Sequence, residues 1–250
     1  MGKFDGLLIC SDMDGTLFWK RQISEENREA IRYFRENGGA FTVASGRDPN
    51  WLLRNIGREF FHSPVICVNG GVIYDPAEDK ILFRGIMPNG YQETVREAMH
   101  WDGMKEVHFF PATLSDKRCL TAEDSEEASV LLSRELIKVV FCVTDEATDV
   151  IKKRLRERLD ERFLVARSWS TGIEIFGESY SKGYACRRVA RLIGADTLIC
   201  MGDYENDLSM ICEADIGVAM GNALPSVKEA ATVVTATAEE HGVAKFIYSL

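Results

Sequence analysis

The chain has 250 residues, and 39 acidic against 30 basic side chains give it a formal charge of −9. Nucleic-acid binding is not expected, because it requires a basic face that replaces the counterions of the phosphate backbone. With 46% hydrophobic and 28% charged residues the composition is that of a globular protein, and this length permits one large domain or two smaller ones.

The sequence also limits membrane, redox and zinc chemistry. No apolar run reaches the roughly 18 residues of a spanning helix, and the N-terminus lacks the apolar stretch of a secretory signal, so we expect a cytoplasmic protein without a membrane partner. The seven cysteines lie mostly in apolar runs, form no CxxC pair and do not cluster with the four histidines at zinc-finger spacing. They are interpreted as reduced core residues, and zinc is not expected.

The first 70 residues alternate predicted strands and helices, each strand marked by an apolar run and each helix by helical spacing behind a capping residue. In chain order these are strand Gly6–Ser11, helix Glu25–Asn37, strand Ala40–Ser45, a helix from Asp48 to about Phe60, and strand Val65–Val68. Such alternation predicts a parallel sheet with helices on both faces, in which ligands gather at the carboxyl ends of the strands.

From about Val72 the pattern changes to strands in hairpin-like pairs between helices. The expected elements are strands Val72–Tyr74 with Ile81–Phe83, helix Tyr91–Trp101, strands Glu106–Phe110 with Arg118–Thr121, helix Asp124–Glu135, strand Ile137–Val143, helix Ala147–Leu159, and strands Phe163–Arg167 and Gly172–Phe176.

After Ser181 the strand–helix alternation returns. The expected elements are helix Tyr184–Ile193, strand Thr197–Met201, a short helix after Asn206, strand Ile216–Ala219, helix Pro225–Ala230, strand Thr232–Val234 and a helix from Glu239. The interrupted pattern predicts an α/β, doubly wound, mostly parallel core domain (1–75 and 178–250) with an α+β domain (76–177) inserted in it.

Two carboxylates, Asp12 and Asp14, follow the first strand within Asp-Met-Asp-Gly-Thr. Acidic groups at the enclosed end of a buried strand are costly without a cation. The alternative is an Asx turn closed by Gly15, and from this motif alone the two interpretations are about equal.

Two further strand ends carry polar residues. Ser45-Gly46-Arg47 precedes a helix N-terminus, where a hydroxyl and free N–H groups suit a phosphate, and Asp203, Asn206 and Asp207 follow the strand at Thr197–Met201. Lys182 begins a helix, where the dipole disfavours a cation that has no anionic partner. If Lys182 has no partner in the folded protein, we expect Lys182→Ala to leave stability unchanged or raised.

Together these motifs resemble the haloacid dehalogenase superfamily, within it the Cof-type phosphatases with a C2 cap. The resemblance covers nearly the whole chain. The family's four motifs occur in its order as Asp12-x-Asp14-Gly15-Thr16, Ser45-Gly46-Arg47, Ser181-Lys182-Gly183 and Gly202-Asp203-x-x-Asn206-Asp207-x-x-Met210. A fifth family-like segment spans 217–223. The inserted domain, lying between the second and third motifs, corresponds to the C2 cap.

The resemblance implies a Mg²⁺-dependent phosphatase that acts on small phosphorylated metabolites, with sugar phosphates as the leading class. Asp12 would be the nucleophile that forms an aspartyl phosphate, and Asp14 the general acid and base. The ion would be held by Asp12, Asp203 and the Asp14 carbonyl, with Asp207 in support. The phosphate would be held by Met13 N–H, Ser45, Gly46, Lys182 and Asn206.

Three other functions remain open at this point. A phosphomutase would return the phosphoryl group to a sugar; a phospho-accepting signalling module would not need Asp14 or the insertion; a binding protein would not need the intact Asp and Lys set. Arg47 either touches substrate or ties a loop carboxylate. We interpret His100, Trp101 and His108 as core or surface residues and 152–158 as a solvated helix face. Residues 69–71 are interpreted as a turn entering the cap, and their position at a strand end leaves a contact to the phosphate side open as the alternative. The substrate and the oligomeric state cannot be predicted.

Overall fold

The computed structural model describes residues 2–115 and 117–250, which divide into two compact units. The first unit contains residues up to Phe83 and from Lys182 to Leu250, and the second contains Arg84–Ser181. Among the described residues, no helix is both long and apolar enough to cross a membrane.

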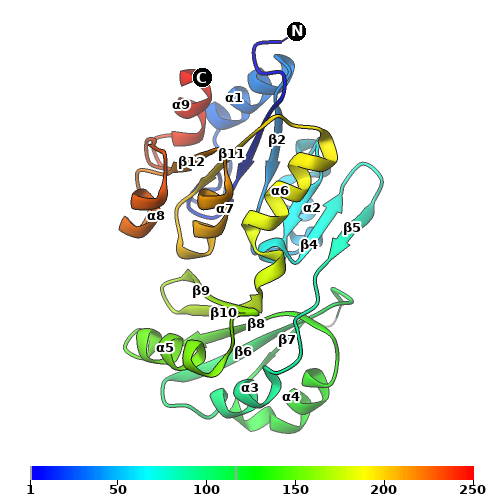
Figure 1. The fold of residues 1–250 in the computed structure, drawn as a ribbon, viewed down its shortest axis with the longest axis vertical. Helices are drawn as coiled ribbons and strands as arrows, with labels where there is room; N and C mark the ends of the chain where they lie inside the picture. Colours follow the sequence, from blue (N-terminus) through cyan, green and yellow to red (C-terminus); the bar gives the residue numbers. More distant parts are fainter. Residues whose placement is uncertain (1, 116) are drawn as a thin grey trace. The chain divides into compact units, whose positions relative to one another are not determined.

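The first unit is built on a five-stranded parallel sheet in the order β13-β12-β11-β1-β2 (Figure 1). Its strands are β1 (Leu7–Ser11), β2 (Ala40–Val43), β11 (Thr197–Gly202), β12 (Ile216–Ala219) and β13 (Val233–Val234). Its helices are α1 (Glu25–Glu36), α2 (Pro49–Ile56), α6 (Lys182–Ile193), α7 (Leu208–Glu213), α8 (Pro225–Ala230) and α9 (Gly242–Ser249).

The core of this unit follows from strand alternation, which sends neighbouring side chains of β1 to opposite faces of the sheet. Leu8 and Cys10 pack in one apolar cluster with α6, including Val189. Ile9, which is also fully buried, faces the other way. The α1 and α9 helices, from opposite ends of the chain, lie side by side (Figure 1).

A small antiparallel sheet, β3 (Val65–Cys67), β4 (Val72–Asp75) and β5 (Lys80–Arg84), completes the first unit. The expected boundary after residue 75 would divide the hairpin at 72–83 between the two domains, whereas the structure keeps residues up to Phe83 in the first unit. The reason is that β5 joins the sheet of β3 and β4 as its third strand. The expected helix to Phe60 instead ends at Ile56, because Gly57 adopts φ 97°.

The second unit is a five-stranded antiparallel sheet in the order β7-β6-β8-β10-β9. Its strands are β6 (Met104–Pro111), β7 (Arg118–Leu120), β8 (Leu136–Val143), β9 (Phe163–Trp169) and β10 (Gly172–Gly177), and its helices are α3 (Gln92–Ala98), α4 (Ser125–Leu132) and α5 (Thr148–Arg158). Lys138 and Glu174 form an ion pair in which both side chains are 2% exposed.

All seven cysteines are free thiols. Four of them, Cys10, Cys67, Cys186 and Cys200, are buried as expected. The expectation was wrong for Cys119 and Cys212, which are exposed, and Cys142 is only partly buried.

Candidate functional site

The carboxyl ends of β1 and β11 bring the first and fourth motifs together. These strands are parallel neighbours, with Ser11 in register with Met201, and the Asp12 N–H donates to the Met201 carbonyl at 2.8 Å. The turn after β1 is tight because Gly15 has φ 89°. A Cβ there would lie 2.5 Å from Asp203 Oδ2, so this close approach requires glycine.

Lys182, the first residue of α6, lies between two of the predicted acids. Its Nζ donates to Asp12 Oδ1 and to Asp207 Oδ1, each at 2.6 Å. The lysine side chain is fully buried, and the Asp12 and Asp207 side chains are 9% and 0% exposed. The unfavourable position of a lysine at a helix start is therefore offset by two carboxylates.

The charges in this cluster do not balance. Burial raises the pKa of the Asp12 carboxyl well above its usual value, and repulsion from Asp207 raises it further against the attraction of Lys182. Burial and Asp207 also raise the pKa of Asp203 to about 7. Burial alone would lower the pKa of Lys182, but Asp12 and Asp207 outweigh it and raise that pKa.

Asp203 and Asp207 are held by different partners. Asp203 Oδ1 accepts from the Thr16 hydroxyl at 3.0 Å, and its Oδ2 accepts from the Asn222 amide at 3.3 Å. Asp207 Oδ2 accepts from the N–H groups of Asp203 and Tyr204 at 2.9 and 3.0 Å. Both oxygens of Asp207 are thus committed to protein donors, which suits a supporting role.

The donor set fits a hard divalent cation. Carboxylate oxygens of Asp12, Asp203 and Asp207 lie within 4.8 Å of one another, and all three residues are buried. Three carboxylates and one ammonium leave a charge of about −2, which one divalent cation neutralises. A set of oxygen ligands favours Mg²⁺ over zinc or copper.

Asp14 points to a different partner. Arg47 Nε and Nη2 donate to its two carboxylate oxygens, each at 3.1 Å, and the guanidinium also lies 4.4 Å from the Trp51 ring centroid. Of the two interpretations of Arg47, the structure favours the tie to a loop carboxylate. Both side chains are nearly half exposed, so the pair is weak and exchangeable.

The second motif is connected to the fourth through Asn69. The Asn69 N–H donates to the Ser45 carbonyl at 2.9 Å, and its side-chain oxygen accepts from Asn206 Nδ2 at 3.3 Å. A Cβ on Gly46 would lie 3.2 Å from the same oxygen. Ser45 Oγ accepts from the Arg47 N–H at 3.1 Å. Asn69 therefore belongs to the first unit, not to a turn that enters the second.

Three residues that position the site were not assigned roles from the sequence: Thr16, Asn69 and Asn222. Asn222 donates to the Gly15 carbonyl and to Asp203, and its own carbonyl accepts from the Ala238 N–H. Thr16 and Asn222 lie in family-like segments, which was the available signal. For Asn69, left-handed backbone at φ 55° is compatible with asparagine, but its side-chain partner is a tertiary contact.

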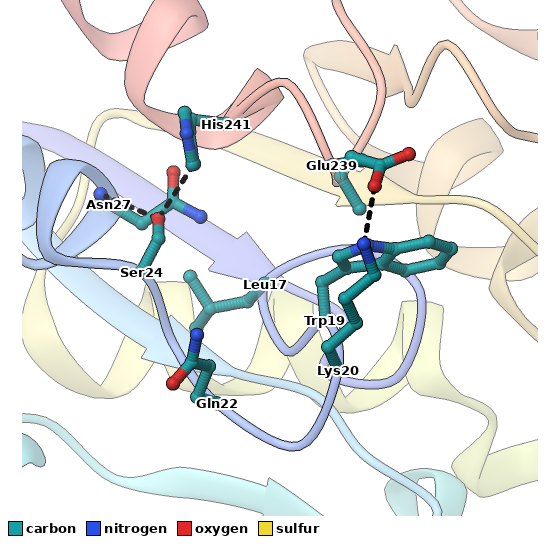
Figure 2. Close-up of a pocket in the computed structure, with 9 residues that line it drawn as sticks. Leu17, Trp19, Lys20, Gln22, Ser24, Asn27, Glu239 and His241 are labelled. Atoms are coloured by element: carbon teal, nitrogen blue, oxygen red, sulfur yellow. Dashed lines mark hydrogen bonds and ion pairs between the residues drawn. The ribbon is translucent and has the colours of Figure 1, made fainter.

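A separate pocket of about 220 Å³ lies beside the loop that follows β1 (Figure 2). Lys20 pairs with Glu239 across it at 2.6 Å, and His241 Nδ1 lies 3.0 Å from the Ser24 hydroxyl. Its lining is Leu17, Trp19, Lys20, Gln22, Ser24, Asn27, Ala238, Glu239 and His241, so it is distinct from the carboxylate cluster.

Comparison with known proteins identifies the family. The model of the haloacid dehalogenase-like hydrolases matches residues 9–128 and 120–247. The 5-amino-6-(5-phospho-D-ribitylamino)uracil phosphatase YcsE of Bacillus subtilis is 32% identical in an alignment 247 residues long, which covers 96% of this chain and 94% of that protein. This chain therefore belongs to the haloacid dehalogenase-like hydrolases.

Solved structures agree with this assignment. A haloacid dehalogenase-like hydrolase from Bacteroides thetaiotaomicron matches with a TM-score of 0.73 and 26% identity over 99% of both chains. The subclass IIB sugar phosphatase BT4131 shares the fold, with a TM-score of 0.81 and 21% identity over 97% of this chain and 98% of that one. The predicted α/β fold and the prediction of a phosphatase of this superfamily are confirmed.

Proposed function

We propose that this protein is a Mg²⁺-dependent phosphatase that hydrolyses phosphate monoesters of small metabolites through an aspartyl phosphate on Asp12. The contact of Lys182 with both Asp12 and Asp207 carries this proposal. Lys182 orients the buried Asp12 carboxylate and places a positive charge beside it. An anionic nucleophile needs such a charge to attack an anionic phosphoryl group.

The reaction divides into two displacements. An Asp12 carboxylate oxygen forms a bond to phosphorus while the ester P–O bond breaks, and Asp14 gives its proton to the leaving oxygen. Asp14 then takes a proton from water, whose oxygen displaces Asp12 and releases inorganic phosphate. Because Arg47 holds the Asp14 carboxylate, the ion pair between Asp14 and Arg47 must open before Asp14 can transfer a proton.

Other residues would bind the phosphoryl group and the ion. Ser45, Asn206, Lys182 and the N–H groups of Met13 and Gly46 would donate to the phosphate oxygens. Asp12, Asp203 and the Asp14 carbonyl would hold Mg²⁺, with Asp207 in support. When bound, Mg²⁺ supplies charge that offsets the carboxylates and the phosphoryl group.

Sugar phosphates are the leading substrate class. The relative named as a 5-amino-6-(5-phospho-D-ribitylamino)uracil phosphatase acts on a phosphorylated ribityl compound by its name, so this compound should head the screen. We also propose that the second unit, residues 84–181, is the C2-type cap domain. Free thiols throughout the chain support a reducing location such as the cytoplasm.

Phosphate release from a panel of phosphorylated metabolites tests the proposal, with Asp12→Asn as the key variant. We expect wild-type turnover to be lost in this variant, while cooperative thermal unfolding is retained. Asp145→Asn, which changes an exposed aspartate of the second unit, is the matched control. Activity of Asp12→Asn within about tenfold of wild type would contradict a covalent role for Asp12.

A further inference from the structure

The turn that follows β3 has an unusual backbone. Its residues Val68, Asn69 and Gly70 all have left-handed φ angles, of 53°, 55° and 97°. Glycine and asparagine adopt this conformation readily, but a β-branched valine in it is a strained outlier. Both Val68 and Asn69 are completely buried. Strain of this kind persists only where the surrounding contacts determine it, and it is concentrated at functional sites.

Two backbone hydrogen bonds hold this turn against the second motif. The Val68 N–H donates to the Arg47 carbonyl and the Asn69 N–H to the Ser45 carbonyl, each at 2.9 Å. The Ser45 carbonyl belongs to the same planar peptide unit as the Gly46 N–H, so the bond from Asn69 also fixes the plane of that N–H. A turn that only joined β3 to β4 would not need these contacts, because connecting turns ordinarily lie in solvent.

The side chain of Asn69 reaches the fourth motif, where its Oδ1 accepts from Asn206 Nδ2 at 3.3 Å. The backbone on either side of Asn206 is already held, because Asp207 Oδ2 accepts from the N–H groups of Asp203 and Tyr204. These bonds do not determine how the Asn206 side chain is rotated. An amide has a donor end and an acceptor end, so the bond to Asn69 determines which end faces the second motif.

We propose that Asn69 is a positioning residue for the transferred phosphoryl group, which it does not touch itself. It holds one N–H of Asn206 Nδ2, so that the second N–H of the same nitrogen donates to a phosphoryl oxygen. A donor fixed in this way before substrate binds needs no reorganisation during the reaction. The inference rests on the proposed function and adds the carboxyl end of β3 to the strand ends that build the site. Residues 69–71 then have their role on the phosphate side.

The variant Asn69→Gly isolates the side chain, because glycine keeps both the left-handed backbone and the N–H that bonds to Ser45. It should lower kcat/KM at least about tenfold, the usual effect of losing a hydrogen bond to a charged group. It should weaken the binding of inorganic phosphate by a similar factor, measured by calorimetry with Mg²⁺ present. The matched control is Asn37→Gly, which removes an amide bonded to the Tyr33 carbonyl at 2.8 Å and should change neither quantity.

A double-mutant cycle with Asn206→Ala tests the route of the effect. If Asn69 acts through Asn206, then Asn69→Gly should alter neither quantity by more than about twofold once residue 206 is alanine. A turn with only a structural role would instead give losses that add in the double variant. Urea unfolding checks that all variants fold.

Three results would overturn the role of Asn69: no phosphate binding in wild type, wild-type phosphate affinity in Asn69→Gly, or additive losses in the double variant. Phosphate binding requires no turnover, so this test is separate from that of the proposed function. A wild-type protein that binds phosphate but hydrolyses no ester would refute the phosphatase, and the cycle on phosphate affinity would still decide the role of Asn69.

Discussion

Lys182 and Asp207 form a completely buried ion pair, with Nζ 2.6 Å from Oδ1 and both side chains 0% exposed. This contact changes what the helix-start position of Lys182 predicts. Without a partner, its removal would relieve an unfavourable dipole interaction and leave stability unchanged or raised. The structure shows that removal instead leaves buried carboxylates without their cation.

We therefore predict that Lys182→Ala destabilises the metal-free protein by about 3–5 kcal/mol, the usual cost of removing one member of a buried pair. It should also lower kcat/KM at least about a hundredfold, because the phosphoryl group loses a cation. Urea unfolding and phosphate release measure the two effects. Lys20→Ala, which breaks an exposed pair with Glu239, is the control and should leave stability nearly unchanged.

An unchanged unfolding midpoint for Lys182→Ala would show that the carboxylates take up protons without cost. Unimpaired turnover would show that another lysine serves the phosphoryl group. These results are separable, because stability is measured without substrate.

The Asp14–Arg47 pair predicts unequal effects of its two members. Arg47→Ala should lower kcat/KM by less than about tenfold, because the exposed pair contributes at most about 1 kcal/mol and must open for proton transfer. Asp14→Asn should lower it by about a hundredfold or more, as expected for the loss of a general acid and base. Steady-state kinetics with the best substrate of the screen decide this.

Arg187→Ala is a matched control, since Arg187 forms a similar two-point pair with Asp215 elsewhere in the first unit. If Arg47→Ala lowers kcat/KM as much as Asp14→Asn does, while Arg187→Ala stays fully active, then Arg47 binds the substrate rather than only the Asp14 carboxylate.

The sequence predicted those parts of the site that lie at the carboxyl ends of parallel strands. Asp12 and Asp203 follow neighbouring strands, so their proximity follows from topology alone. The second partner of Lys182 and the Asn69–Asn206 contact are tertiary choices, which no local pattern encodes. Likewise, apolar runs predicted buried cysteines, but Cys119 on the edge strand β7 and Cys212 on α7 are exposed.

Metal removal should affect both activity and stability. We predict that EDTA abolishes phosphate release and that Mg²⁺ restores it, whereas Ca²⁺ does not, because its larger, looser coordination shell can engage the nucleophilic carboxylate. Mg²⁺ should also raise the unfolding temperature, because an ion that binds only the folded state stabilises it by mass action. At a free Mg²⁺ concentration of a hundred times the dissociation constant this stabilisation is about 2.7 kcal/mol. Asp203→Asn should lose most of this rise. Full activity in chelator would refute the metal requirement.

The raised pKa of Asp203 predicts a specific pH dependence of stability without metal. Its folded pKa is about 7 and its ordinary value 3.8. Below the ordinary value the carboxyl is protonated in both states. Between the two values the unfolded carboxyl ionises while the folded one retains its proton, so this group's stabilisation is lost as pH rises, by at most about 1.4 kcal/mol per pH unit.

Asparagine at 203 cannot ionise, so comparison with Asp203→Asn isolates the effect from other carboxylates, several of which have lowered pKa values and act in the opposite direction. We predict that the variant's unfolding free energy, relative to wild type, increases from about pH 4 to about pH 7 and then levels off. Urea titrations in EDTA at unit pH steps measure it. With saturating Mg²⁺ the increase should shrink, because the cation replaces protons among Asp12, Asp203 and Asp207. A difference that stays constant between pH 4 and 8 would show that Asp203 ionises normally, and that burial and Asp207 do not act on it as the geometry requires.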